Sequence, residues 1–341
     1  MRVPKSVDTI VVTNLPSFYK INLYNRIAEY RRLLVVFTGD GAEGRNRDFY
    51  RGDKYFDFVF LNNNRALRLL QLLAILRRVS YSELQLGGWD SLPLWLAAYC
   101  SPKSVNSLVV ESSYIESTIR GLRGWLKRRF VRRVSKVYAS GSSQRRLVKM
   151  LGFEGKTIIT RGVGVFNYVE QPAYVARDRV SRFLYVGRLT AVKNLRWLIE
   201  VFNTLPHLSL TIVGFGEQEA ELKSLAADNI EFVGAVDNNR LSEVYQRHDV
   251  FVLPSLSEPW GLVVEEALNN GLPVLVSDRV GCADEIVRDG ENGLVFRCGD
   301  KADLCRKLSE IQSPTLYNNL RLNICKMRFD EIASTQVKCY L

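Results

Sequence analysis

A short acidic stretch at residues 258–266, EPWGLVVEE, carries the clearest candidates for chemistry in this 341-residue chain. Glu258 lies in a loop, and Glu265 and Glu266 lie on the helix that we expect to follow it. Two carboxyl groups about 5–10 Å apart can act as acid and base in glycoside hydrolysis, and Glu258 and Glu266 could meet that distance. Neighbouring residues of a helix point about 100° apart, so Glu265 and Glu266 cannot share one role.

The same stretch also predicts an anion site. Pro259 and Gly261 favour a turn, and a helix begins directly after it. The amides of Gly261, Leu262 and Val263 would then be unpaired donors at the positive end of the helix. Such an end binds phosphate groups and other anions readily.

Two cations follow an earlier strand, in VGRLTAVKN (186–194). Arg188 comes directly after the strand, and Lys193 stands where the next helix begins. A planar guanidinium fork and a mobile ammonium together suit a diphosphate. Alone, the pair could equally be two solvated surface cations. Together with an anion-binding helix end, however, these cations disfavour a glycosidase, which has no use for them.

The elements that must position these residues are parallel strands. The first half of the chain has unbroken apolar runs separated by helical patterns, and the same alternation restarts at residue 182. Such runs predict parallel sheets covered on both faces, and ligands bind at the carboxyl ends of their strands. The expected strands are 7–13, 33–38, 56–62, 83–88, 107–112, 136–141, 156–163, 182–187, 208–214, 230–235, 250–255 and 273–278.

The fold class is therefore α/β, with two doubly wound, Rossmann-like domains and a cleft between them. We expect a first domain at 1–169, a linker at 170–181 and a second domain at 182–312. Residues 313–341 read as one helical segment, which we expect to cross back to the first domain. Ser313 is placed to cap this helix, and Pro314 to occupy its first turn.

Several motifs in this order and spacing resemble family 4 retaining glycosyltransferases of the GT-B fold, of the type that builds bacterial polysaccharides. The resemblance is strong over residues 182–296 and looser but colinear before them. It rests on VGRLTAVKN (186–194), the VG-x-G turn (213–216), FVLPS (251–255), EPWGLVVEEALNNGLPV (258–274) and GCADEIVRDGENGLVF (281–296). Upstream, 16–30, 84–99 and 139–153 are similar to the acceptor-side domain. The resemblance therefore implies that 1–169 is an acceptor-binding domain and that 182–312 is a nucleotide-sugar-binding domain.

The resemblance implies a role for each acidic residue. Glu258 and Glu266 match the family's pair eight positions apart, in which the first contacts the donor sugar and the second accepts hydrogen bonds from the ribose. Arg188 and Lys193 match the cations that neutralise the departing diphosphate. Glu265 falls outside the motif, and we expect it to tolerate substitution.

Further site residues follow from the same resemblance. The amides of Gly261, Leu262 and Val263 would hold the phosphate or the sugar. Gly214 lies in the turn after a strand, and main chain near Gly234 to Val236 would contact the base. Glu111 or Ser112 stands where many members have a catalytic histidine.

Composition narrows the chemistry further. Only two histidines occur, which argues against His-based metal sites and Ser/His triads, and the six cysteines show no CxxC spacing. No Asp-x-Asp triplet occurs, so we expect a metal-independent enzyme without a cofactor, its donor being a UDP- or GDP-linked sugar. We find neither a secretory signal nor a membrane span in the sequence, which predicts a cytoplasmic protein.

The charge is uneven along the chain. Residues 1–170 hold 28 Lys and Arg against 13 Asp and Glu, whereas the remainder holds 19 against 23. Residues 120–136 hold eight cations and no acid, with Leu122, Trp125, Leu126, Val131 and Val134 at roughly helical spacing. This segment is either an ordinary helix packed on a sheet or an amphipathic helix on an anionic membrane. We expect the second, on the inner face of the plasma membrane.

The leading hypothesis is thus a glycosyltransferase acting on a lipid-linked or oligosaccharide acceptor in cell-surface polysaccharide synthesis. One alternative is a nucleotide-sugar epimerase of the same fold, which would convert its donor without an acceptor. Another is a non-enzymatic basic module that binds anionic lipid or nucleic acid. The acidic balance of the second half argues against nucleic acid as the main partner.

Overall fold

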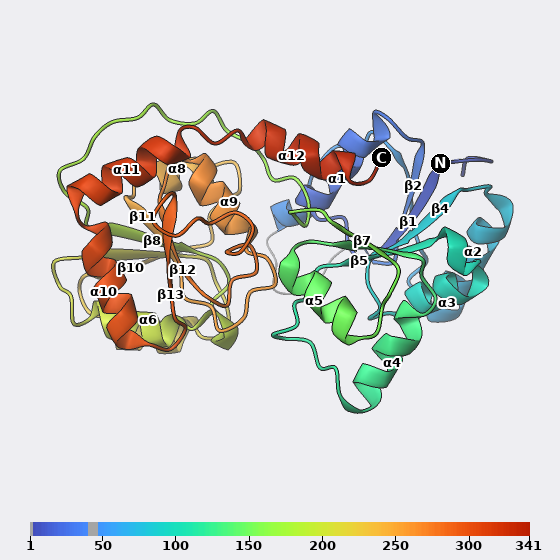
Figure 1. Ribbon diagram of the computed structural model, residues 1–341, viewed down its shortest axis with the longest axis horizontal. Coiled ribbons are helices and arrows are strands. Elements are labelled where there is room, and N and C mark those ends of the chain that lie inside the picture. The colour runs from blue at the N-terminus through green and yellow to red at the C-terminus, as the bar shows by residue number, and fades with distance from the viewer. Residues whose placement is uncertain (1–2, 40–46) are drawn as a thin grey trace. The chain divides into compact units, whose positions relative to one another are not determined.

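The computed structural model describes residues 3–39 and 47–341 of the chain (Figure 1). These residues form two compact units: unit 1 comprises residues 1–165 and 332–341, and unit 2 comprises residues 166–331. The chain thus returns to unit 1 with its last residues, as we expected of the C-terminal helical segment. Each unit is built around one parallel sheet.

Unit 1 contains a seven-stranded sheet in the order β3-β2-β1-β4-β5-β6-β7. All of its neighbouring strands run parallel, and Val11 on the inner strand β1 pairs with Val35 of β2 and Gln85 of β4. The strands are β1 (Thr9–Thr13), β2 (Leu33–Phe37), β3 (Asp57–Phe60), β4 (Glu83–Leu86), β5 (Asn106–Val110), β6 (Lys136–Ala139) and β7 (Lys156–Ile159). The helices are α1 (Phe18–Ala28), α2 (Arg65–Arg78), α3 (Leu92–Cys100), α4 (Gly121–Val131) and α5 (Ser142–Met150), with η1 (Arg47–Tyr50) and η2 (Lys103–Val105) as short 3-10 helices.

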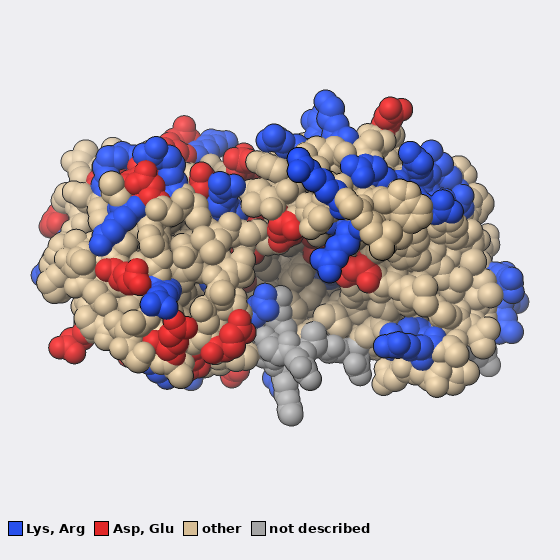
Figure 2. Space-filling view, turned by 90° about the horizontal axis from the view of Figure 1, so that it is seen from below, with Lys and Arg blue, Asp and Glu red and all other residues tan. Residues whose placement is uncertain are grey.

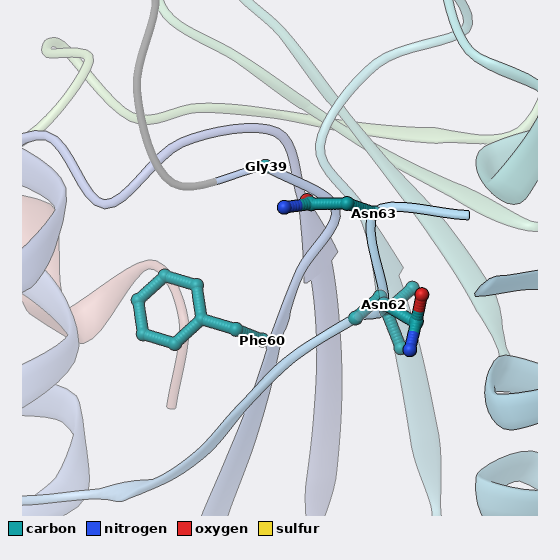
Figure 3. Close-up of a pocket in the computed structure, with 5 residues that line it drawn as sticks. Gly39, Phe60, Asn62 and Asn63 are labelled. Atoms are coloured by element: carbon teal, nitrogen blue, oxygen red, sulfur yellow. The ribbon is translucent and has the colours of Figure 1, made fainter. Parts of the chain in front are cut away.

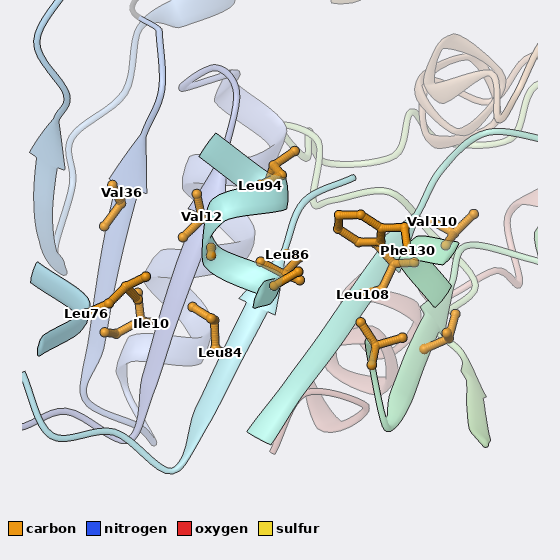
Figure 4. Close-up of a cluster of buried hydrophobic side chains, with 14 of the residues drawn as sticks. Ile10, Val12, Val36, Leu76, Leu84, Leu86, Leu94, Leu108, Val110 and Phe130 are labelled. Carbon is orange, nitrogen blue, oxygen red and sulfur yellow. The ribbon is translucent and has the colours of Figure 1, made fainter. Parts of the chain in front are cut away.

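The main hydrophobic core of unit 1 lies on the face of this sheet that α2, α3 and α4 cover (Figure 4). Ile10 and Val12 of β1 point into it, together with Leu76 of α2 and Leu94 of α3. Val11, between them in sequence, is also buried, although it lies outside this cluster. Burial on both faces explains why the strands read as unbroken apolar runs rather than as an alternating pattern.

Unit 2 contains a six-stranded parallel sheet in the order β10-β9-β8-β11-β12-β13. Its strands are β8 (Arg182–Val186), β9 (Ser209–Val213), β10 (Ile230–Gly234), β11 (Val250–Leu253), β12 (Val274–Ser277) and β13 (Gly293–Phe296). Its helices are η3 (Ala191–Lys193), α6 (Leu195–Phe202), α7 (Glu219–Leu225), α8 (Leu241–Gln246), α9 (Leu262–Asn269), α10 (Lys301–Ile311) and α11 (Pro314–Ile324). Helix α12 (Phe329–Lys338) begins in unit 2 and ends in unit 1.

Each of the predicted strands is present, but three details differ from our expectations. Residues 293–296 form the edge strand β13, which we did not predict. The C-terminal segment is two helices, α11 and α12, because the main chain turns at Met327, whose amide bonds to Ile324 O. Pro314 does occupy the first turn of α11, but the Ser313 side chain makes no capping hydrogen bond.

The strand orders locate the ligand-binding edge of each sheet. In unit 1 the order reverses between β1 and β4, and in unit 2 it reverses between β8 and β11. Ligands of doubly wound sheets bind beyond the carboxyl ends of the strands at such a reversal. In unit 2 these ends lead directly into residues 187–194 and 254–261, which hold the predicted site.

Candidate active site

The loops that follow β8 and β11 are tied to each other. The amide of Leu256 donates to Val192 O at 2.9 Å, and Asn194 Nδ2 donates to Pro254 O at 3.3 Å. Asn194 has the left-handed φ of 59°, which asparagine tolerates better than most residues. These contacts hold the end of η3 beside the residues that precede α9.

Lys193 and Glu258 consequently form an ion pair. Their side chains are only 13% and 14% exposed, so the pair is mostly screened from water. The Lys193 ammonium has three donors, and the contact with Glu258 leaves the others available for a ligand. The two residues that we predicted from separate motifs therefore belong to one site.

Arg188 comes shortly after the end of β8, at the same edge of the sheet as Lys193. Its side chain is exposed, and its carbonyl accepts a hydrogen bond of 2.9 Å from the hydroxyl of buried Tyr185. Burial raises the Tyr185 pKa, with a further contribution from the charge of Glu258 and an opposing one from Arg188. Tyr185, which our sequence reasoning missed, therefore stays protonated and donates to the loop that carries Arg188.

The turn before α9 places three main-chain amides at the start of this helix. Gly261 takes a left-handed φ of 96° and precedes the helix, and Val264 N makes the first helical bond, to Gly261 O at 2.9 Å. Within residues 3–39 and 47–341, no carbonyl accepts from the amides of Gly261, Leu262 or Val263. These three donors lie at the positive end of α9.

The two adjacent glutamates of α9 have different partners. Glu266 is half-buried and accepts a hydrogen bond of 3.2 Å from the Tyr245 hydroxyl. Glu265 is 4% exposed and accepts a hydrogen bond of 2.6 Å from Trp260 Nε1. The separate directions agree with helix geometry, but the burial of Glu265 argues against our expectation that this residue tolerates substitution.

Burial also changes the acidity of both groups. Burial raises the pKa of Glu265 to about 8. The hydrogen bond from Trp260 lowers this pKa, and the nearby charge of Glu266 raises it. Burial raises the pKa of Glu266 to about 7, against the bond from Tyr245. Perturbed carboxyl groups of this kind are common at functional sites.

Gly214 lies where two carboxyl-edge loops approach most closely. Its amide donates to Gly234 O at 2.8 Å, which links the ends of β9 and β10. A Cβ atom at Gly214 would lie 1.8 Å from Gly187 O, so no other residue fits without moving the loop. Val236, half-buried, follows β10 at the same edge of the sheet.

In unit 1 the predicted Glu111 comes directly after β5. It pairs with Lys20 of α1, with Oε1 2.9 Å from Nζ. Burial alone would lower the Lys20 pKa, but Glu111, Tyr19 and Tyr24 together outweigh it and raise the pKa. Lys20 stands in the stretch PSFYK and was not among the predicted site residues. Ser112 lies beside Glu111 and is half-buried.

A cavity of about 380 Å³ opens beyond the ends of β2 and β3 in unit 1 (Figure 3). Phe60 and Asn63 extend to the same side of it, below Gly39. The Phe60 ring is 40% exposed and stacks on Phe37 with 5.1 Å between centroids. The volume of the cavity lies near the small end of the range for ligand sites, about 300–1,000 Å³.

Helix α4 exposes much of its apolar side. Leu122 is 71% exposed, Trp125 52% and Leu126 37%, whereas Phe130 is fully buried. The first turns of this helix therefore do not pack on the sheet, contrary to the simpler of our two interpretations. Val134 lies beyond the end of α4 at Val131.

Only part of the basic segment 120–136 is free for a partner. Arg133 donates to Ala98 O and Ser101 O at the end of α3, and Lys136 pairs with Glu83. Arg129 instead lies against the rings of Trp125 and Tyr99, at 5.7 and 5.9 Å from their centroids. In Figure 2, Lys and Arg predominate over the part formed by unit 1, whereas acidic and basic residues interleave on unit 2.

Comparison with known proteins shows what the chain is similar to. Residues 170–324 match the family model described as glycosyl transferases group 1. The chain is 38% identical over 128 residues to the sulfoquinovosyl transferase SQD2 of Arabidopsis thaliana, covering 37% of the chain and 25% of that protein. It is 35% identical over 148 residues to the lipopolysaccharide core biosynthesis glycosyltransferase LpsE of Rhizobium meliloti, covering 41% of each.

The fold comparison extends over nearly the whole chain. The structure of Anabaena Alr3699/HepE in complex with UDP superposes with a TM-score of 0.72 at 17% identity, covering 96% of this chain and 97% of that one. Two parallel α/β units of this kind are the GT-B fold. The chain is similar to the glycosyltransferase group 1 family, GT4, over residues 170–324, as its motifs suggested. It spans between a quarter and about half of the length of the curated relatives that it matches.

Proposed function

We propose that this protein transfers a sugar from a nucleotide-diphosphate donor, UDP- or GDP-linked, to a saccharide acceptor with retention of the anomeric configuration. The observation that carries the proposal is the convergence in unit 2 of Arg188, Lys193, Glu258 and the α9 end. All of them meet at the reversal point of one parallel sheet. Cations, a free helix end and a sugar-binding carboxylate together suit a departing nucleoside diphosphate better than any other ligand class.

Each residue has a part in holding the donor. Arg188 and Lys193 bind the diphosphate oxygens, and the amides of residues 261–263 bind the phosphate or the sugar. Glu258, oriented by Lys193, accepts a hydroxyl of the donor sugar. Glu266 accepts the ribose hydroxyls, and main chain near Gly214 and Val236 contacts the base.

The chemistry follows from where the charge develops. As the bond from the anomeric carbon to the phosphate oxygen breaks, negative charge collects on the diphosphate. Fixed cations and amides aimed at that charge stabilise the transition state. The acceptor oxygen forms its bond on the same face of the sugar, and its proton passes to the departing phosphate oxygen. In this mechanism Arg188 and Lys193, rather than a metal ion, neutralise the charge that develops on the diphosphate.

Unit 1 supplies the acceptor side. Its carboxyl edge carries Glu111, paired with Lys20, in the position of the family's histidine. The same edge carries the cavity beside Phe60 and Asn63, where an aromatic ring and an amide could contact a saccharide. LpsE acts in lipopolysaccharide core biosynthesis, and by analogy we assign this chain to surface polysaccharide assembly on a lipid-linked acceptor.

The basic helix α4 would bring the enzyme to that acceptor. Trp125, Leu122 and Leu126 are exposed on it among arginines, which is the composition of a helix that lies on an anionic membrane. Cations near such a surface contribute about 1 kcal/mol each. No helix of residues 3–39 or 47–341 is long and apolar enough to cross a bilayer. We therefore propose peripheral attachment to the cytoplasmic leaflet.

The test is a binding and turnover screen of the purified full chain against UDP-, GDP- and ADP-sugars. We expect one nucleotide to bind, and Glu266→Ala to weaken it at least tenfold. Glu243→Ala, an exposed carboxylate on the neighbouring helix α8, is the matched control. The proposal fails if no sugar nucleotide is bound or consumed and Glu266→Ala binds nucleotides as the wild type does. Conversion of the donor sugar without an acceptor would identify an epimerase instead.

A further inference from the structure

Among the residues that the structure describes, none forms an ion pair with the buried carboxyl group of Glu265. It is 4% exposed, and its hydrogen bond comes from the indole Nε1 of Trp260, itself 3% exposed, at 2.6 Å. Burying a carboxyl group is costly unless its hydrogen bonds are made inside the protein. Glu265 points away from Glu266, which bonds to Tyr245, so it does not share the role of a ribose contact. The cost of burying this carboxyl group therefore needs another explanation.

Trp260 stands inside the turn that carries the proposed donor site, between Glu258 and Gly261. One side of this turn is held by main-chain bonds. Gly281 N donates to Glu258 O at 2.8 Å, and Cys282 N donates to Trp260 O at 2.8 Å. The other hold is the indole, which α9 anchors through Glu265.

The turn has little freedom once both holds are in place. Gly261 has a φ of 96°, and a Cβ atom there would lie 3.1 Å from Val280 and 3.3 Å from Glu258. The direction of the Gly261 amide and of the Glu258 side chain therefore depends on where this turn is held. The indole anchor thus acts together with the bonds to residues 279–282 and with the Lys193–Glu258 ion pair.

We propose that Glu265 is a positioning residue of the donor site. Its carboxyl holds the Trp260 indole, and the indole fixes the turn 258–261 so that Glu258 and the free amides face the donor. Glu265 itself touches no substrate. The inference rests on the proposed function only for the identity of the ligand, because the anchoring of the turn can be measured in the ligand-free protein.

The experiment compares Glu265→Leu, which removes the acceptor, with Glu265→Gln, which keeps it, in the full chain. Amide hydrogen exchange of the free protein is the first measurement. We expect residues 260–263 to exchange at least tenfold faster in Glu265→Leu, with the rest of unit 2 unchanged, and Glu265→Gln to restore protection. Val264→Ala, a buried change on the same turn of α9, should lower the melting temperature without this local effect.

Binding of UDP and GDP is the second measurement. We expect Glu265→Leu and Trp260→Phe each to raise Kd roughly tenfold, and the double variant to lose no more than either alone. Unchanged exchange in Glu265→Leu overturns the proposal whether or not nucleotides bind. Faster exchange with unchanged Kd overturns its link to the donor. Failure of the wild type to bind any nucleotide overturns the proposed function, while the exchange result still decides the anchoring.

Discussion

Glu265 should also make the stability of unit 2 depend on pH. The perturbation is Glu265→Gln, which removes the titrating group and keeps an oxygen that can accept from Trp260. Burial raises the pKa of Glu265 from 4.5 to about 8 in the folded protein. The folded state therefore holds this proton over a range in which the unfolded state has released it.

The sign and size follow from this difference. Because the folded pKa is raised, the stabilisation is complete below the unfolded value of 4.5 and is lost as pH rises toward about 8. Each pH unit across this window changes the free energy of unfolding by about 1.4 kcal/mol, so the full penalty is on the order of 5 kcal/mol. Glu266, with its pKa raised to about 7, acts in the same direction and remains in the variant.

Calorimetric melting of the wild type and Glu265→Gln between pH 5 and 9 measures the effect. We expect the variant to gain stability over the wild type steadily up to about pH 8 and the difference to level off above it. Glu243→Gln, exposed on α8, should follow the wild type across the range. A difference between Glu265→Gln and the wild type that stays flat from pH 5 to 8 would refute the reasoning.

Three further outcomes can be checked. Arg188→Ala should weaken UDP or GDP binding by about 1.5–3 kcal/mol, the value of a hydrogen bond to a charged group. Arg247→Ala, at an exposed arginine of the same unit, should leave this binding unchanged. Titration calorimetry that found binding unchanged in both variants would remove Arg188 from the site. Gly214→Ala should destabilise unit 2 by about 2–5 kcal/mol through overpacking and backbone strain, which would be measured as a lower Tm. A variant with the Tm of the wild type would contradict the close contact between Gly214 and the loop at Gly187. Trp125→Ser should reduce binding to phosphatidylglycerol vesicles roughly tenfold, since burying a large apolar side chain contributes about 1.5–3 kcal/mol. Tyr30→Ser, at a residue of unit 1 that is even more exposed (68% against 52%), should not reduce this binding. Equal losses in both variants would argue against α4 as the contact.

The fold was largely predictable because parallel strands leave a strong signal. Burial on both faces produces runs such as LLVVF (33–37) and VFVL (250–253), which the sequence shows without ambiguity. The edge strand β13 was harder to see, since GLVF (293–296) is short and follows a turn. The break between α11 and α12 left no sign either: it contains no glycine or proline, and the apolar spacing continues through it.

Part of the candidate site could be predicted from the sequence, and part could not. Arg188, Lys193 and Glu258 were predictable because strand ends and helix starts fix where they must lie. The pairing of Trp260 with Glu265 was not, because a turn decides which side of α9 the indole reaches. The fate of Arg133 was equally hidden, since only the folded chain brings the end of α3 within reach of its guanidinium. From the sequence alone Arg133 is interpreted as a free cation, whereas in the structure it donates to carbonyl groups at the end of α3.

The environments of Glu258 and Glu266 explain why this acidic pair need not act as acid and base. Glu258 accepts a hydrogen bond from the Lys193 ammonium, with which it forms an ion pair. Glu266 has a pKa raised to about 7 by burial, which could suit a general acid in the absence of a ligand. Ribose hydroxyls donating to this carboxyl would favour its charged form and lower that pKa. Donor binding would therefore convert Glu266 into an acceptor as well, and the site as a whole would present acceptors to the sugar and the ribose and donors to the diphosphate.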